Sequence, residues 1–473
     1  MRLNRSILSA FLVILLLLSP VLSACVGSPS ATDETGSVSG EPSDSSEPAG
    51  IDSESESELE ESETEPVAPV PETELVDTRE YVAPEDRTFT ILGTPLSDYN
   101  MMLCWQNEKE YDRMGVGTFK KVLRGITIPV LGYEMDLTVS RNDKFYNASK
   151  FDHEILFGYE FRREGIPEYD GSKSFYGVTE NGTVYFCSPT VMLYPYMWQL
   201  FMEEFFGSPV YSGWESYGCN ITEPVYREVP DLDHDALSAE GYSLVFEDEF
   251  DGPEINWDVW EIRHERNIYS PSLFSIRDGC LILKGDYLDN GEEGAGWYES
   301  EIRLKQQYCR GVFEATILCS SCEGRGDLYG SAFWIQGPHP YEEDKSLGGP
   351  GEGGAELDIM ENWETDFVSS GIFVNGYDDS PELDNFLSVV RGLGNNYQDS
   401  FHTFTLIWDE TLYRTYVDGR LVLATNYGLG TATVPEEVIL SICLHRSNAE
   451  PPAEGAEYNY ETVVDSLRIW QKQ

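Results

Sequence analysis

Residues 355–362 read Ala-Glu-Leu-Asp-Ile-Met-Glu-Asn, and the alternation of acidic and apolar side chains predicts a β-strand. Glu356 and Asp358 would project from one face of this strand, while the apolar residues beside them enter the core. A regular strand would turn Glu361 to the apolar face. One extra residue in a β-bulge, placed most simply at Met360, returns it to the acidic face. The stretch therefore predicts three carboxylates on one face of one strand.

The residues around this strand carry a matching pattern. From residue 241 to the C-terminus, short apolar or alternating segments recur between turn-forming residues, and hardly any helical periodicity is present. About thirteen such segments within about 230 residues are typical of a β-sandwich or jelly roll. We therefore expect an all-β domain over residues 241–473.

The preceding part of the chain mixes two periodicities. Residues 85–228 contain strand-like segments together with helix-like stretches at 108–122 and 190–206, the second strongly apolar. This order predicts a small α/β accessory domain. Residues 229–240 are turn-rich and acidic, and we expect them to be a linker.

The N-terminus is expected to direct export. Two early arginines precede an apolar run over residues 7–18, which has the length of a signal-peptide h-region and is too short for a membrane span. The run ends in Leu-Ser-Ala-Cys at 22–25, which resembles the bacterial lipobox. Residues 1–25 would then be a lipoprotein signal peptide, and lipidated Cys25 would hold the protein on the outer face of the bacterial cell membrane. The alternative is an ordinary secretory signal cleaved near Ala24.

An acidic segment separates this signal from the folded part. Residues 26–84 are rich in Ser, Glu and Pro, and up to residue 78 they contain no Lys, Arg or aromatic side chain. Such a composition predicts a disordered tether, because too little apolar surface is available to offset the ordering entropy. The net charge of the whole chain is -53. This charge argues against nucleic acid as a partner and against membrane contact other than through the lipid anchor.

Nine cysteines are present, Cys25 included. Export permits disulfides, but several cysteines lie in apolar strand patterns and are expected to be free and buried. Cys319 and Cys322 form a C-x-x-C pair, for which a local disulfide and a plain loop both stay open.

The acidic strand has a clear chemical use. Retaining glycosidases need two carboxyl groups roughly 5–5.5 Å apart, one as the nucleophile and one as the general acid/base. Crowded like charges raise one carboxyl pKa, which keeps that acid protonated near neutral pH. Asp358 would lie between the two glutamates, where it can hydrogen-bond the nucleophile. From the motif alone, a solvated acidic strand face remains the alternative.

The string Glu356-x-Asp358-x-x-Glu361 resembles the active-site signature of glycoside hydrolase family 16 in its bulged, laminarinase-like form. Further segments resemble the family in the same order along the chain: residues 246–252, 277–283, 298–305, 311–315, 331–335, 416–419 and 464–470. The resemblance covers about residues 241–473. It implies a concanavalin A-like jelly-roll β-sandwich as the catalytic domain.

By matching position, the resemblance implies Glu356 as the nucleophile, Asp358 as its helper and Glu361 as the general acid/base. Three further residues would bind substrate. Trp334 would support the sugar nearest the cleavage point, with core packing as the alternative. Arg303 would reach the cleft from a neighbouring strand or be a surface charge, and Trp363 would be a sugar platform or pack at the core or rim.

No cofactor is expected for catalysis. The family often binds a structural calcium ion, and Glu249, Gly279 and Asp465 occupy the matching positions. Oxygen ligands of this kind suit calcium, which would tie the first strand of the domain to the last.

The sequence departs from the common laminarinase pattern in the cleft, at residues 329–331 and 442–446, and residues 348–354 are expected to be a mobile rim loop. The resemblance implies endo-acting, retaining double displacement, with β-1,3- or mixed β-1,3/1,4-glucan as the first choice of substrate. The alternatives are a β-galactan, agar-type or host glycan, or a non-catalytic carbohydrate-binding surface lipoprotein. The protein is expected to be monomeric.

Overall fold

A computed structural model of the chain describes residues 88–104, 119–120, 122–128, 130–140, 145–206, 219–263, 269–320, 328–338, 354–373, 386–390, 396–425, 431–444, 449–456 and 458–472. The side chains of residues 219–220, 364, 373 and 386–390 are not described. The signal peptide with Cys25, the tether, Cys322 and residues 348–353 of the expected rim loop lie outside the described residues. None of the helices in the described part is both long enough and apolar enough to cross a membrane.

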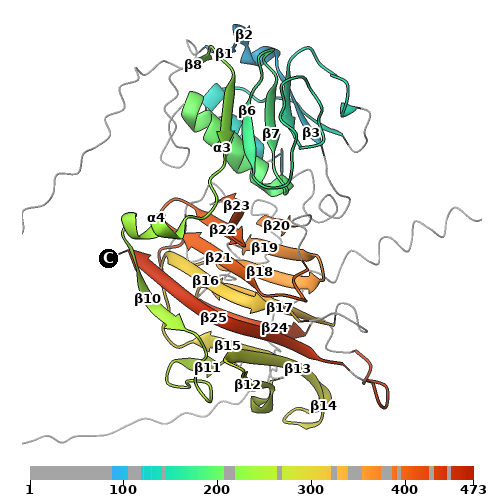
Figure 1. The fold of residues 1–473 in the computed structure, drawn as a ribbon, viewed down its shortest axis with the longest axis vertical. Helices are drawn as coiled ribbons and strands as arrows, with labels where there is room; N and C mark the ends of the chain where they lie inside the picture. The colour runs from blue at the N-terminus through green and yellow to red at the C-terminus, as the bar shows by residue number, and fades with distance from the viewer. Residues whose placement is uncertain are drawn as a thin grey trace, which may run out of the picture. The chain divides into compact units, whose positions relative to one another are not determined.

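Residues from 241 onward form two stacked antiparallel sheets (Figure 1). The larger sheet has nine strands in the order β12-β13-β25-β16-β21-β22-β23, with β10 paired to β25 and β14 paired to β13. Its strands are β10 (Tyr242–Asp248), β12 (Phe274–Arg277), β13 (Cys280–Gly291), β14 (Gly294–Tyr298), β16 (Gly311–Leu318), β21 (His402–Trp408), β22 (Tyr413–Val417), β23 (Arg420–Thr425) and β25 (Tyr460–Lys472).

The second sheet has seven strands in the order β11-β15-β24-β17-β18-β19-β20. These are β11 (Trp260–Ile262), β15 (Ser300–Leu304), β17 (Tyr329–Gln336), β18 (Glu356–Glu364), β19 (Phe367–Phe373), β20 (Phe386–Val390) and β24 (Glu437–Leu444). Alternate residues of both sheets bury apolar side chains in one core, for example Phe313 and Leu406 from the larger sheet and Phe333, Leu357 and Leu440 from the smaller. The expected all-β sandwich is confirmed.

The described residues before 229 form an α/β arrangement, as the mixed periodicity predicted. A six-stranded sheet has the order β4-β3-β5-β7-β6-β9, in which β4, β3, β5 and β7 are parallel and β6 pairs antiparallel with both β7 and β9. Its strands are β3 (Asn100–Cys104), β4 (Leu137–Ser140), β5 (Glu154–Phe157), β6 (Phe175–Val178), β7 (Val184–Cys187) and β9 (Val225–Glu228). A three-stranded sheet contains β1 (Phe89–Ile91), β2 (Thr94–Pro95) and β8 (Cys219–Ile221).

The long helix of this region covers one face of the six-stranded sheet. It is α3 (Tyr194–Phe205), which begins with Pro195 in its first turn, where proline is tolerated, and follows the 3-10 turn η4 (Val191–Leu193). The Trp198 and Phe186 ring centroids lie 5.9 Å apart, so aromatic packing joins α3 to β7. Other short elements are η2 (Leu96–Asp98), α4 (His234–Ala239) and η6 (Pro271–Leu273).

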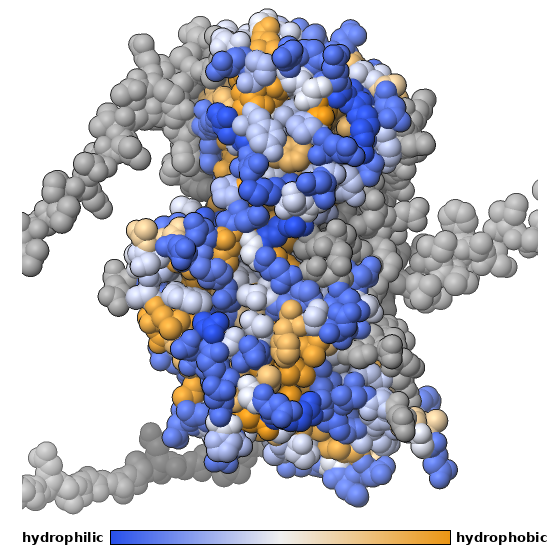
Figure 2. Space-filling model, viewed as in Figure 1, coloured by the Kyte–Doolittle hydropathy of each residue, from blue (hydrophilic) through white to orange (hydrophobic). Residues whose placement is uncertain are grey.

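The described cysteines are free and mostly buried, and the surface is largely hydrophilic, as the composition led us to expect. Six cysteines of the described residues are free, and four of these are buried: Cys104, Cys187, Cys319 and Cys443. The choice between a local disulfide and a plain loop at Cys319 and Cys322 stays open, because Cys322 lies outside the described residues. Figure 2 shows a largely hydrophilic face with smaller hydrophobic patches, as the acidic composition suggests.

Candidate active site

The predicted acidic strand is β18, and its pairing with β17 brings the three carboxylates to one face. Each acid lies opposite an alternate residue of β17: Glu356 opposite Gln336, Asp358 opposite Trp334, and Glu361 opposite Ala332. Met360 faces Phe333, so the register skips Ile359 between Asp358 and Met360. This is the predicted bulge, moved by one residue, because Ile359 rather than Met360 is the extra residue. The bulge restores the phase that a regular strand would have lost.

Burial separates the two faces of this sheet. Phe333, Ile335 and Leu357 belong to the main core between the sheets. Ala332 and Trp334, together with a neighbouring isoleucine of β24, form a small apolar cluster apart from that core. The acids share their face with this second cluster and point away from the sandwich core.

The three acids differ in their surroundings. Glu356 is 1% exposed, and its Oε2 accepts a hydrogen bond from the Gln336 amide at 3.0 Å. Glu361 is partly exposed, and its Oε2 accepts from the Ser369 hydroxyl of β19 at 3.3 Å. Asp358 is buried between them. Burial, followed by the charges of Glu361 and Glu356, raises the pKa of Asp358 well above its usual value.

Trp334, predicted to support a sugar, lies on the acid face directly across from Asp358. Only 2% of its surface is exposed, and its indole N–H donates to the Ser441 hydroxyl of β24 at 3.2 Å. The guanidinium of Arg263 lies over the indole ring, 4.8 Å from its centroid. The indole is thus held from two sides at the floor of the candidate site.

The other two predicted substrate residues are also on this sheet. Arg303 of β15 donates from Nε to Glu261 at 2.8 Å and from Nη1 to Glu437. It is therefore part of an ion-pair network and not an isolated surface charge. Trp363 lies against Gly330 of β17, where an added Cβ would be 2.1 Å from the indole ring. Glycine at this position is what lets the indole approach the backbone so closely.

Sequence reasoning missed the polar network that adjoins the acids. It alternates arginines and carboxylates across three strands and the residue after β11: Glu261, Arg263, Glu301, Arg303 and Glu437. It continues through Gln336 to Glu356. A signal was available, because the patterns Glu261-x-Arg263 and Glu301-x-Arg303 each place an acid and an arginine on one strand face. The network lacks a motif of its own, so it became visible only when the strands were paired.

The predicted calcium ligands are only partly suited to a metal. The Glu249 carboxylate accepts from Arg468 Nη2, so a cation already neutralises it. Asp465 has the Cys280 thiol as a weak neighbour at 3.9 Å, and Gly279 lies in a turn with φ +75°. No group of three or more His, Cys, Asp or Glu side chains in the described ranges is arranged to hold a metal. Glu249 therefore does not fit the role that the sequence predicted for it.

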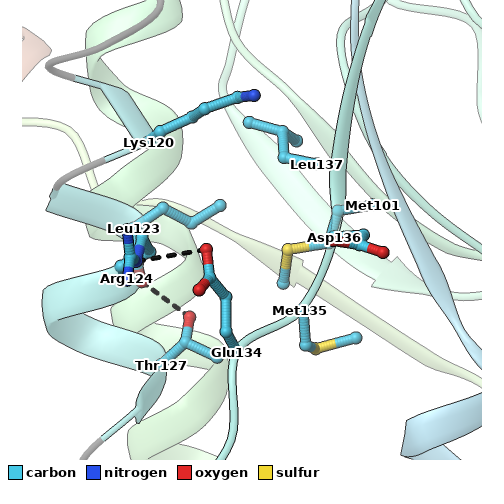
Figure 3. Close-up of a pocket in the computed structure, with 9 residues that line it drawn as sticks. All are labelled: Met101, Lys120, Leu123, Arg124, Thr127, Glu134, Met135, Asp136 and Leu137. Atoms are coloured by element: carbon cyan, nitrogen blue, oxygen red, sulfur yellow. Dashed lines mark hydrogen bonds and ion pairs between the residues drawn. The ribbon is translucent and has the colours of Figure 1, made fainter.

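A small cavity of about 90 Å³ lies in the α/β region (Figure 3). Arg124 and Glu134 line it and form an ion pair at 3.1 Å, and the Thr127 hydroxyl donates to the Leu123 carbonyl at 2.6 Å. The lining carries two carboxylates, Glu134 and Asp136, and Glu134 is paired with Arg124 rather than grouped with other acids. The sandwich sheet thus remains the candidate active site.

Comparisons with known proteins complete the description. No protein-family model matches the chain, and no curated protein does. Among solved structures, the laminarinase catalytic domain from Thermotoga maritima has 21% identity and a TM-score of 0.40, covering 49% of this chain and 99% of its own. A non-specific endo-β-1,3(4)-glucanase of glycoside hydrolase family 16 has 19% identity and a TM-score of 0.40, covering 49% and 92%. Porphyranase B from Zobellia galactanivorans has 15% identity and a TM-score of 0.40, also covering 49% and 92%. About half of this chain is thus similar to solved structures of glycoside hydrolases.

Proposed function

We propose that the chain is a retaining glycoside hydrolase of family 16 that cleaves a β-linked polysaccharide with Glu356 and Glu361. The observation that carries the proposal is the bulge of β18, which places both glutamates and Asp358 on one sheet face outside the core. A solvated acidic strand would leave its carboxylates exposed. Here Glu356 and Asp358 are buried, and the charges of acidic neighbours add to burial in raising the pKa of Asp358.

Each acid suits one step of double displacement. The Glu356 carboxylate, already accepting from Gln336, would attack the anomeric carbon and form a glycosyl ester. The partly exposed Glu361 would protonate the leaving oxygen, then remove a proton from the water that hydrolyses the ester. The raised pKa of Asp358 favours its protonated form, which would donate a hydrogen bond toward a neighbouring glutamate. Two inversions give net retention of the β-configuration.

The proposed substrate is a β-1,3- or mixed β-1,3/1,4-glucan cut within the chain. A neutral polymer suits the net charge of -53, which disfavours strongly anionic glycans. Trp334 lies on the acid face, but it is 2% exposed, so it supports the site from below rather than through an open ring face. A β-galactan, agar-type or host glycan is the rival within the enzyme class. A binding module is less well supported, because binding alone needs neither the bulge nor crowded carboxylates.

The proposal is tested by incubating the full chain with neutral and sulfated polysaccharides and analysing the products. We expect oligosaccharides of several lengths from a β-glucan, with the β-anomer of the new reducing end formed first in proton NMR spectra. An α-anomer formed first would contradict retention. If no polysaccharide in the panel is cleaved while some are bound, the chain is a binding module and the proposed activity falls.

We also propose that Cys25 carries a lipid that holds the enzyme on the outer face of the cell membrane. The support is the sequence at 22–25 and the acidic tether that follows it. Cys25→Ala should release the protein from the membrane fraction or block its maturation. Unchanged membrane retention would contradict the anchor.

A further inference from the structure

Arg263, the residue just after β11, is placed to influence the nucleophile through Gln336. Its side chain is only 3% exposed, and polar contacts hold it on several sides. Nη1 donates to Glu301 at 2.8 Å, Nε donates to Glu437 at 3.2 Å, and Nη2 donates to Oε1 of Gln336. Its guanidinium plane also lies over Trp334. A buried arginine with these partners has a fixed position.

This arrangement determines how the Gln336 amide is turned. A guanidinium can only donate hydrogen bonds, so the atom that faces Arg263 must be the carbonyl Oε1. The amide nitrogen must then face the other way, where it donates to Oε2 of Glu356 at 3.0 Å. Reversing the amide would set two donors against each other at Arg263 and two acceptors against each other at Glu356. Arg263 thus fixes the direction of the hydrogen bond that the nucleophile receives.

A donor aimed at a carboxylate favours its charged form. Glu361 on the same strand acts in the opposite direction, and Glu437 lies in the same cross-strand row on β24, where Arg263 and Arg303 pair with it. The hydrogen bond from Gln336 is thus a contact that favours the charged form of Glu356.

We infer that Arg263 and Gln336 form a positioning relay that orients the Glu356 carboxylate and keeps it ionised as the attacking group. The inference rests on the proposed function of Glu356 and assigns two residues that the acidic motif does not contain. Arg263 is a positioning residue, since it acts through Gln336. Its contact with Trp334 ties the same relay to the indole at the floor of the site.

The first test uses pH–rate profiles of kcat/KM on whichever polysaccharide the enzyme cleaves. The acidic limb reports the free enzyme's nucleophile. In Arg263→Met and in Gln336→Met this limb should move up by about one pH unit. Activity at its optimum should fall about a hundredfold, mainly in kcat, because the carboxylate is no longer held in position. Arg263→Lys should recover part of the loss, since lysine keeps the charge without the fork geometry.

Control variants separate the relay from folding and from loss of charge. Arg263→Met leaves the mostly buried Glu301 without this partner, which could unfold the chain. Glu301→Gln in the same chain removes that charge, and Gln336→Met breaks the relay while Arg263 keeps both carboxylates. Arg277→Met is the charge-matched control, because Arg277 is exposed and pairs with Glu461 on the other sheet. It should leave the profile of the parent unchanged.

The second test needs no substrate. Tryptophan fluorescence is titrated with pH, and the difference between the parent and Trp334→Phe isolates the indole beside Arg263. The titration step that disappears in Glu356→Gln belongs to Glu356, and in Gln336→Met this step should move up by about one pH unit. If the fluorescence step and the acidic limb of the pH–rate profile do not move in Arg263→Met and Gln336→Met, the proposed relay is wrong. The proposed hydrolase activity would not be affected by that result. If the parent cleaves nothing, the proposed function fails while the fluorescence step still decides the relay.

Discussion

Glu154 begins β5 of the α/β region with 3% of its surface exposed, and Arg163 donates to it from Nε at 2.8 Å. A backbone N–H at Lys150 also donates to this carboxylate, at 2.8 Å. Asp358 of the sandwich is buried as well, but the groups that most affect its pKa after burial are the carboxylates Glu361 and Glu356. In the α/β region, hydrogen-bond donors surround the buried Glu154. In the sandwich, two further carboxylates lie beside the buried Asp358.

The difference separates structural burial from functional burial. An acid paired with a guanidinium and backbone N–H groups remains charged, and it ties the local chain together. Acids grouped together repel one another, so one of them retains its proton at the expense of stability. Burial of a carboxylate alone therefore does not mark an active site. The charge of its neighbours does.

The largest expected effect tests this contrast on turnover. Glu356→Ala should lower kcat by about 10⁴-fold or more, because the glycosyl ester can no longer form. Glu154→Gln, a change to an equally buried acid, should leave kcat unchanged at a temperature where it is folded. Both are measured on the same polysaccharide, with circular dichroism to confirm folding. Full activity in Glu356→Ala would remove the basis for calling the sandwich acids functional.

The roles of the two glutamates are separated by azide rescue. Glu361→Ala should lose less than Glu356→Ala on an activated aryl glycoside, because a good leaving group needs little protonation. Azide should restore part of the Glu361→Ala activity by attacking the glycosyl ester, giving a β-glycosyl azide. With Glu356→Ala it should give the α-azide instead. The opposite stereochemistry would show that the two roles are reversed.

The second prediction concerns stability in the α/β region. Glu154→Gln should lower the free energy of unfolding by about 3–5 kcal/mol, because it leaves the buried guanidinium of Arg163 without its carboxylate. Urea denaturation measures the change. The double variant Glu154→Gln with Arg163→Met should recover much of the loss, because no unpaired charge stays buried. A single variant as stable as the parent would mean that this pair contributes nothing.

The next prediction concerns Asp358, whose contribution to the stability of the folded state should fall as pH rises. Its pKa is raised on folding by burial and by Glu361 and Glu356, so the folded state binds a proton more tightly than the unfolded state does. Its contribution to stability is complete below about pH 4, the unfolded value, and is lost as pH rises through the raised folded value. Asp358→Asn has no such proton. The Tm of the parent should fall relative to that of Asp358→Asn between about pH 4 and neutrality, and parallel curves would contradict the raised pKa.

The contrast between these regions also shows what a sequence can reveal. The acidic strand could be predicted because alternation fixes which side chains share a face, and the bulge was required to bring Glu361 to the acidic face. Its position was missed by one residue, since Ile359 and Met360 are both apolar and both buried. The Arg263 network could not be predicted as a unit, because its members come together only through the order β11-β15-β24-β17-β18. Local patterns identify the acids, while sheet topology decides which arginines reach them.

The smallest expected effect concerns calcium at the junction of β10 and β25. Glu249, like Glu154, is paired with an arginine, because Arg468 donates a hydrogen bond to its carboxylate. This pairing makes Glu249 a poorer metal ligand than its position suggested. If Asp465 and the Gly279 carbonyl still bind calcium, chelation should lower the Tm by about 2–4 °C, equivalent to about 1 kcal/mol. Arg468→Met would free the Glu249 carboxylate and should enlarge that decrease. A chelator that changes neither Tm would show that this acid, like Glu154, is held by its arginine and serves no metal.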